Sequence, residues 1–250
     1  QIVTAALAII GNEILSGRTQ DLNVAFLGQN LNDIGVQLRE VRVVPDIEAE
    51  LVKAVNELRA RFDYVFTTGG IGPTHDDITP ESVAAAFGRK AVYHPEAYRR
   101  LGDWYAANGR EFTLARKRMT LMPEGAELID NEVSIAPGFR VENVFVMAGV
   151  PKIMQAMFWA ARPLLKGAAP VRSRSLITRI PEGVLADGLG LIQKRYPETD
   201  IGSYPFYKET GNGVALVVRA TDQAQIDAAA TEVAALIRQL GGEVLDDAAA

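Results

Sequence analysis

A glycine-rich segment followed by two carboxylates is the part of the sequence best suited to chemistry. It reads Thr-Thr-Gly-Gly-Ile-Gly-Pro-Thr-His-Asp-Asp-Ile-Thr and spans residues 67–79. Glycine lets the backbone come close to a bound anion, and free N–H groups in such a loop and at the start of a following helix favour phosphate. We therefore expect Gly69, Gly70, Gly72 and Thr74 to bind a phosphate group. The alternative interpretation is an ordinary tight turn after a strand.

Asp76 and Asp77 lie directly beyond the glycines. Carboxylates beside a phosphate repel it unless a cation bridges them, and a hard divalent cation with oxygen ligands is the simplest solution. The pattern thus predicts bound Mg²⁺, Mn²⁺ or Co²⁺. In the alternative interpretation Asp77 only caps the helix that begins near Pro80, although Thr79 is better placed to cap it. His75, between the glycines and the acids, is interpreted as a solvated loop residue.

Two further polar segments follow other predicted strands. Glu13, in the segment Gly-Asn-Glu-Ile-Leu-Ser-Gly at 11–17, is a candidate metal ligand or base, and Ser16 is a candidate hydrogen-bond donor. Asp46 ends the second strand, and it could equally be only a helix cap. Ligands in open parallel sheets bind at the carboxyl ends of the strands. We therefore expect four acids to gather there around the metal: Glu13, Asp46, Asp76 and Asp77.

Composition excludes several other kinds of site. The 250 residues include no Cys and two His, which rules out thiolate metal sites, iron–sulfur clusters and His-rich zinc sites, so any metal must use oxygen ligands. Lys plus Arg is 26 and Asp plus Glu is 31, a net charge of −5, which gives no electrostatic reason to bind nucleic acid. The basic run Arg116-Lys117-Arg118 is interpreted as a solvated helix face, with contacts to phosphate as the alternative.

Membrane association is not expected either. No apolar run reaches the ~18 residues of a membrane span, and the apolar stretch 2–10 lacks the basic flank of a signal peptide. We therefore expect a cytoplasmic protein without a membrane partner.

Hydrophobic patterning predicts the elements that position these residues. The near-continuous apolar run at 2–10 is typical of a strand covered on both faces, and further strand-forming runs are expected at 36–44, 64–68 and 144–147. Apolar residues at helical spacing lie between the first three runs and after residue 150. This alternation predicts an α/β fold, a three-layer α/β/α arrangement around a mostly parallel sheet.

A second, smaller domain is expected after the segment Lys-Gly-Ala-Ala-Pro at 166–170. Strand and helix patterns there follow the order β-α-β-β-α-β, with the last short strand at 243–245, which predicts a ferredoxin-like α+β domain. We expect domains at 1–165 and 168–250. Gly202-Ser-Tyr-Pro205 is interpreted as a strand end and turn, with a contribution to the rim of the ligand pocket as the alternative.

Taken together, the segments at 11–17, 43–46 and 68–79, with Asp21 and Asn23, resemble the molybdopterin-binding domain family (MoaB/Mog-like). The segments at 131–138 and 149–151 fit the same pattern, so the resemblance covers residues 2–165. Within the family, the sequence is most similar to the N-terminal part of competence/damage-inducible protein A and to the molybdopterin-binding-like domain of eukaryotic FAD synthase.

The resemblance implies an oligomer, a dimer or trimer, whose Gly-Gly-x-Gly loop holds the phosphate of a pterin or nucleotide. It also implies ligand contacts from Pro137 and Gly138, and it matches Asp46 and Asp77 to acids that other members use. In the two similar branches the domain resembles a divalent-metal pyrophosphatase acting on ADP-ribose or FAD. Asn12 departs from the family, which usually has Asp there, and the loss of that carboxylate would weaken metal binding or change its role.

The leading hypothesis is therefore a nucleotide diphosphate hydrolase (pyrophosphatase) with Glu13, Asp46 and Asp77 as its catalytic residues. The alternatives are a non-hydrolytic molybdopterin-binding protein of molybdenum cofactor biosynthesis, and a regulatory remnant whose acids no longer bind metal.

Overall fold

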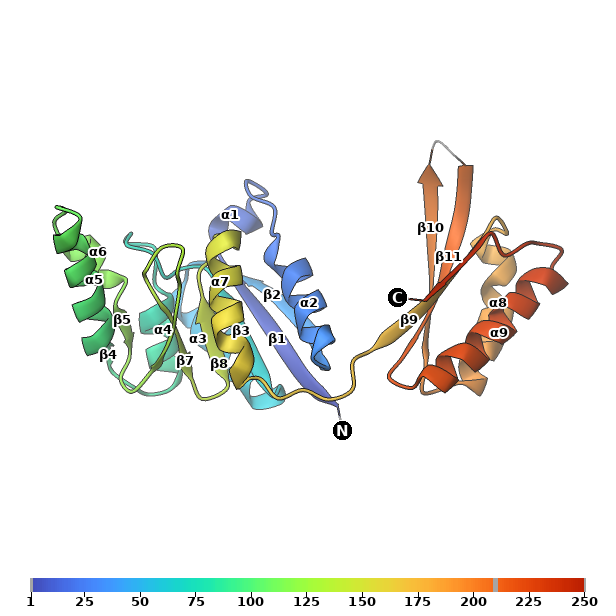
Figure 1. The fold of residues 1–250 in the computed structure, drawn as a ribbon, viewed down its shortest axis with the longest axis horizontal. Coiled ribbons are helices and arrows are strands. Elements are labelled where there is room, and N and C mark those ends of the chain that lie inside the picture. Colours follow the sequence, from blue (N-terminus) through green and yellow to red (C-terminus); the bar gives the residue numbers. More distant parts are fainter. Residues whose placement is uncertain (1, 209–210, 250) are drawn as a thin grey trace. The chain divides into compact units, whose positions relative to one another are not determined.

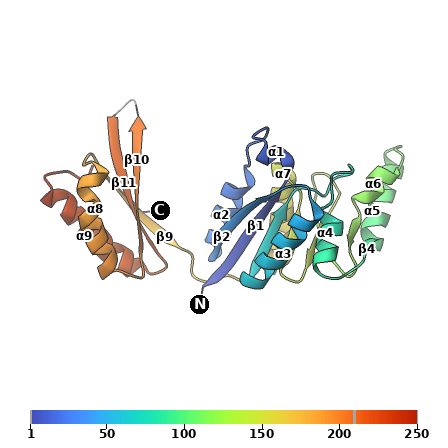
Figure 2. The same cartoon turned by 180° about the vertical axis from the view of Figure 1, so that it is seen from behind.

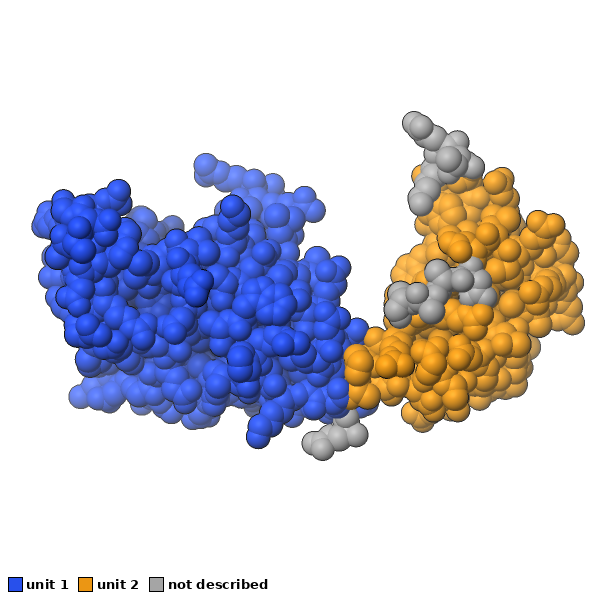
Figure 3. All heavy atoms as spheres, viewed as in Figure 1, with its two compact units in different colours: residues 1–168 blue, residues 169–250 orange. Residues whose placement is uncertain are grey.

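In the computed structural model, which describes residues 2–208 and 211–249, the chain forms two units. The first unit comprises residues 1–168 and the second residues 169–250 (Figure 3). The first unit holds a six-stranded and a two-stranded sheet, and the second unit holds a four-stranded sheet.

A six-stranded sheet forms the centre of the first unit, in the order β2-β1-β3-β8-β7-β6 (Figure 1). Four strands are parallel: β1 (Val3–Ile10), β2 (Val36–Val44), β3 (Tyr64–Thr68) and β8 (Val144–Met147). β7 (Gly138–Val141) and β6 (Glu127–Ile129) extend one edge in antiparallel pairing. The pairs Ile10–Val44, Ile9–Thr68 and Thr68–Met147 keep the ends of the parallel strands level. The loops that follow these strands therefore begin at one common edge.

Helices cover both faces of this sheet (Figures 1 and 2). α2 (Asn23–Asp33) and α7 (Pro151–Ala161) pack on the face that receives Ala5, Leu7 and Ile9 of β1. α3 (Glu48–Arg61) and α4 (Thr79–Ala86) pack on the face that receives Ala6, Ala8 and Ile10. Successive side chains of a strand point to opposite faces, so one uninterrupted apolar run supplies both cores. The predicted three-layer α/β/α fold is confirmed.

A peripheral part of the first unit carries the remaining elements. β4 (Ala91–Tyr93) pairs with β5 (Leu121–Pro123), and between them run α5 (Pro95–Ala107) and α6 (Leu114–Arg118), here called the α5–α6 segment (residues 95–118). The two remaining helical turns are short: α1 (Asn12–Leu15) follows β1, and η1 (Arg162–Leu164) follows α7.

The second unit contains an antiparallel sheet in the order β10-β11-β9-β12. Its strands are β9 (Arg172–Thr178), β10 (Asp200–Lys208), β11 (Gly211–Ala220) and β12 (Asp246–Ala249), so the last strand begins three residues after the one predicted. α8 (Glu182–Arg195) and α9 (Gln223–Gln239) supply Leu185 and Val233 to the core beneath Leu176 and Leu216. The chain order β-α-β-β-α-β is that of the predicted ferredoxin-like fold.

Across the part of the chain that the structure describes, no helix is both long enough and apolar enough to cross a membrane.

Candidate functional site

The glycine-rich loop begins where β3 ends, at the common edge of the parallel strands. Gly69 and Gly70 have φ of 102° and 69°, in the region that favours glycine. A Cβ at Gly69 would collide with the carbonyl oxygen of Ile10, and one at Gly70 with the hydroxyl of Thr79. Close packing alone therefore requires these two glycines, in agreement with the tight-turn interpretation, whether or not the loop also binds a ligand.

Thr79 closes this loop from its far end. Its side chain is fully buried, its hydroxyl donates to the Gly69 carbonyl (3.0 Å), and its amide donates to the Gly70 carbonyl (3.0 Å). The expectation that Thr79 caps the following helix was wrong, because α4 begins at Thr79 itself and the preceding Ile78 makes no side-chain cap. The hydroxyl serves the loop, since a buried carbonyl without a donor would be costly.

Three consecutive amides of the loop are left unpaired. The N–H groups of Gly70, Ile71 and Gly72 donate to no atom of the described residues, and all three residues are partly exposed. Successive free N–H groups in a turn that includes a positive φ form a concave anion-binding site. We call residues 70–72 the amide cradle.

Thr74 and Asp77 hold each other beyond the cradle. The Thr74 amide (2.8 Å) and hydroxyl (2.6 Å) both donate to Oδ2 of Asp77, which also lies close to Gly72. Asp76 and His75 are exposed. A hydrogen bond from the Thr74 side chain, together with one from its own amide, lowers the pKa of Asp76. Asp76 therefore keeps its charge at neutral pH beside the cradle, where it disfavours an anion that arrives without a cation.

Asp46 is paired with Asn12 instead of capping α3. The Asn12 amide donates to Oδ2 of Asp46 (3.0 Å), and the Asp46 amide donates to Oδ1 of Asn12 (3.4 Å). α3 begins two residues later, and no side chain caps it. This reciprocal pair ties the loop after β1 to the loop after β2. An Asp at position 12 could accept the same bond through one oxygen, so Asn12 keeps the geometry and removes one charge.

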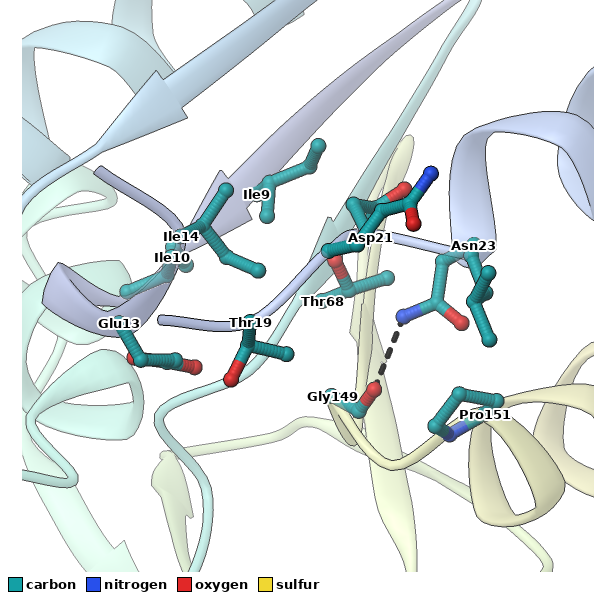
Figure 4. A pocket seen from close by; sticks show the side chains of 12 residues that line it. Ile9, Ile10, Glu13, Ile14, Thr19, Asp21, Asn23, Thr68, Gly149 and Pro151 are labelled. Atoms are coloured by element: carbon teal, nitrogen blue, oxygen red, sulfur yellow. Dashed lines mark hydrogen bonds between the residues drawn. The ribbon is translucent and has the colours of Figure 1, made fainter. Parts of the chain in front are cut away.

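A small pocket opens beside the end of β1, between the loop that leads into α2 and the start of α7 (Figure 4). It has a volume of about 70 Å³, and Glu13, Thr19, Thr68 and Gly149 are among its lining residues. Asn23, 3% exposed, crosses it to donate to the Gly149 carbonyl (2.9 Å). Nothing local in the sequence indicates that Asn23 has a partner 126 residues away.

The other predicted site residues lie in different settings. Ser16 is exposed, and its hydroxyl donates to the Glu13 carbonyl (3.2 Å). Pro137 and Gly138 are buried, and Gly138 opens β7, where a Cβ would collide with the Val146 carbonyl oxygen. The structure therefore gives Gly138 a packing role and shows no surface through which it would touch a ligand.

The carboxylates predicted to bind metal do not converge. Within residues 2–208 and 211–249, no group of three or more His, Cys, Asp or Glu side chains is arranged to hold a metal ion. Asp46 and Asp77 each use Oδ2 for the neighbouring backbone, and Glu13 is exposed. These residues do not fit a metal centre built from protein ligands alone. The divalent cation, and the roles assigned to the four acids, stay predictions.

The first unit is an α/β domain in which a mostly parallel sheet lies between two layers of helices, with the amide cradle at the carboxyl ends of the strands. In open α/β sheets this is the edge where ligands bind. Residues 6–167 match the family described as "Probable molybdopterin binding domain", and the chain belongs to this family. Residues 170–243 match the middle domain of FAD synthase. The family resemblance predicted from the sequence is thus confirmed.

Several known proteins are similar to this chain. A protein of Aeropyrum pernix is 35% identical over 254 residues, which cover 95% of each chain. A protein of Symbiobacterium thermophilum whose name places it among competence-damage inducible proteins is 32% identical, and the match covers 96% of this chain and 59% of that one. The solved structure of the protein CinA, of unknown function, from Thermoplasma acidophilum is 34% identical with a TM-score of 0.60, covering 65% of this chain and 97% of that chain.

Proposed function

We propose that the first unit binds a phosphorylated pterin or a nucleotide and holds its phosphate in the amide cradle. The observation that carries the proposal is the run of three unpaired amides at Gly70, Ile71 and Gly72, at the edge of the sheet where open α/β domains bind ligands. Membership of the molybdopterin binding domain family supports a pterin, and the match of the second unit to FAD synthase supports a nucleotide.

Calorimetric titration tests this proposal with molybdopterin, FAD and ADP-ribose as ligands. We expect at least one of them to bind the unmodified protein. Gly70→Ala should weaken that binding at least tenfold, because a side chain at positive φ would displace the loop. Gly88→Ala is the matched control, since Gly88 also has a positive φ (63°) but a Cβ there meets open space.

The titration has two outcomes that would overturn the proposal. One is the absence of binding for all three ligands. The other is equal affinity of the two variants, provided that Gly70→Ala still unfolds in a single cooperative thermal transition.

The second candidate function is hydrolysis of a nucleotide diphosphate, with ADP-ribose or FAD as substrate and AMP as one product. The carboxylates of Glu13, Asp46 and Asp77 follow strands that end at the same edge as the cradle, and this supports the candidate. A divalent cation would neutralise the diphosphate and supply an activated water. Since the described side chains offer no complete metal site, the ligand's own phosphate oxygens would have to contribute to its coordination.

Release of AMP from FAD and ADP-ribose, measured with Mg²⁺, Mn²⁺ and Co²⁺, tests this second candidate. Asp77→Asn should abolish release, because its side-chain oxygen can still accept from Thr74 while the charge is lost. Asp103→Asn, at an exposed position on α5, is the charge-matched control. Binding without AMP release under any metal would favour the non-hydrolytic role.

A further inference from the structure

The three basic side chains of α6, Arg116, Lys117 and Arg118, have two different kinds of neighbour. Arg116 lies over the ring of Tyr105 (4.6 Å from Cζ to the ring centroid), and Lys117 lies over the rings of Tyr98 and Phe112 (5.7 Å from Nζ to each). These two cations therefore contact aromatic rings of the α5–α6 segment itself, at distances where the ring quadrupole attracts them.

Arg118 points away from that segment and toward the loop that carries the cradle. Its Nη2 donates to the carbonyl oxygen of Asp77 (3.1 Å) and to Oε1 of Glu81 (2.8 Å) on α4. The partners lie 41 and 37 residues away in sequence, and the arginine side chain is only 31% exposed. The interpretation of this run as a solvated helix face was therefore wrong for Arg118.

The pair of Arg118 and Glu81 is incompletely satisfied. Arg118 Nε and Glu81 Oε2 are buried, and neither has a hydrogen-bond partner among the described residues. Each such atom carries a desolvation cost, and a partly buried ion pair is often no more stabilising than apolar residues of similar size. Stability alone is thus a poor account of the pair, whereas the bond to the Asp77 backbone is one that an apolar side chain could not make.

We propose that Arg118 is a positioning residue for the amide cradle, an inference that rests on the proposed function of the loop. It fixes the backbone of Asp77, and the Asp77 carboxylate in turn holds the amide and hydroxyl of Thr74. Glu81 neutralises the guanidinium, so that Arg118 orders the loop without itself attracting the anion. The α5–α6 segment is thereby coupled to the cradle.

Hydrogen exchange of the ligand-free protein tests the positioning directly. The amides of Thr74, Asp77 and Thr79 are hydrogen-bonded within the loop, so their exchange reports its opening. We expect Arg118→Met to speed their exchange about tenfold, as loss of one charge-assisted hydrogen bond implies. Lys117→Met removes the same charge from the adjacent position and should leave these amides unchanged. Unchanged exchange in Arg118→Met, or equal acceleration in both variants, would overturn the inference.

Ligand affinity separates positioning from electrostatics. With whichever of FAD, ADP-ribose or molybdopterin binds the unmodified protein, Arg118→Met should weaken binding about tenfold, and Arg118→Lys should recover part of the loss. The double variant Arg118→Met/Glu81→Gln should stay weak, because neutralising Glu81 does not restore the bond to Asp77. Full recovery in the double variant would overturn the inference. If no ligand binds the unmodified protein, the proposed function fails, while the exchange experiment still decides the role of Arg118.

Discussion

Replacement of Thr79 by Val is the most direct test of how the cradle is built. The two side chains are nearly the same size, but Val cannot donate to the Gly69 carbonyl, which then lacks its only side-chain donor among the described residues. Loss of this bond, with a buried carbonyl left unpaired, costs about 1–3 kcal/mol. The first unit contains 168 residues, and at that size 1 kcal/mol lowers the melting temperature by about 2–4 °C. A cost near 2 kcal/mol therefore predicts a decrease of about 4–8 °C.

Thermal unfolding followed by circular dichroism measures this decrease, and Thr79→Ser is the matched control. Ser keeps the hydroxyl and loses one buried methyl group, which costs about 1 kcal/mol. The expected order of melting temperatures is unmodified protein, Thr79→Ser, Thr79→Val. Equal stability of Thr79→Val and the unmodified protein would refute the reasoning, because it would mean that the hydroxyl does not close the loop. Thr79→Val should also weaken ligand binding, since the same bond fixes the end of the cradle.

Three other predictions concern the second unit, the first unit and the association of the whole chain. Hydrogen bonds from Arg195 and Tyr196 lower the pKa of Glu232, so its charged form stabilises the second unit above the ordinary glutamate range and the benefit is lost as the pH falls through the lowered value. The melting temperature of the second unit should therefore fall more between about pH 6 and pH 3 than it does in Glu232→Gln, and parallel curves would contradict this. Phe158→Ala should cost the first unit about 3–5 kcal/mol in chemical denaturation, because Phe158 is fully buried, whereas half-exposed Trp159→Ala should cost clearly less. Light scattering should give the mass of a dimer or trimer, and a monomer at micromolar concentration would rule out the oligomer implied by the family.

The fold was largely predictable from local patterns. The segments 2–10, 36–44, 64–68 and 144–147 are rich in apolar residues, and each forms a parallel strand of the first unit. The last strand of the second unit begins three residues after the predicted one. Residues 243–249 show no clear alternation of apolar and polar side chains that would mark where the strand begins.

The candidate site was predicted in position but not in its contacts. Asp46 and Thr79 are good capping residue types near the start of helices. In the structure, however, Asp46 bonds to Asn12 in the loop after β1, and Thr79 bonds back to Gly69 at the start of its own loop. Gly138 resembled a ligand-binding residue through its motif and lies buried in β7. Each of these residue types has several uses in proteins, and the contacts that decide between the uses are made in the folded chain.

The sequence by itself determined the order and type of the elements, the glycine-rich turn after β3, and the family to which the chain belongs. The elements and the turn follow from hydrophobic period and from residues with special backbone freedom, which are local properties, and the family follows from the motifs that the sequence shares with it. Only the tertiary structure decided that Asn12 pairs with Asp46, that Asn23 reaches Gly149, and that Arg118 holds Asp77. A hydrogen bond forms only when donor and acceptor come within about 3 Å in a suitable direction, and no pattern along the chain specifies that meeting for segments 34 to 126 residues apart.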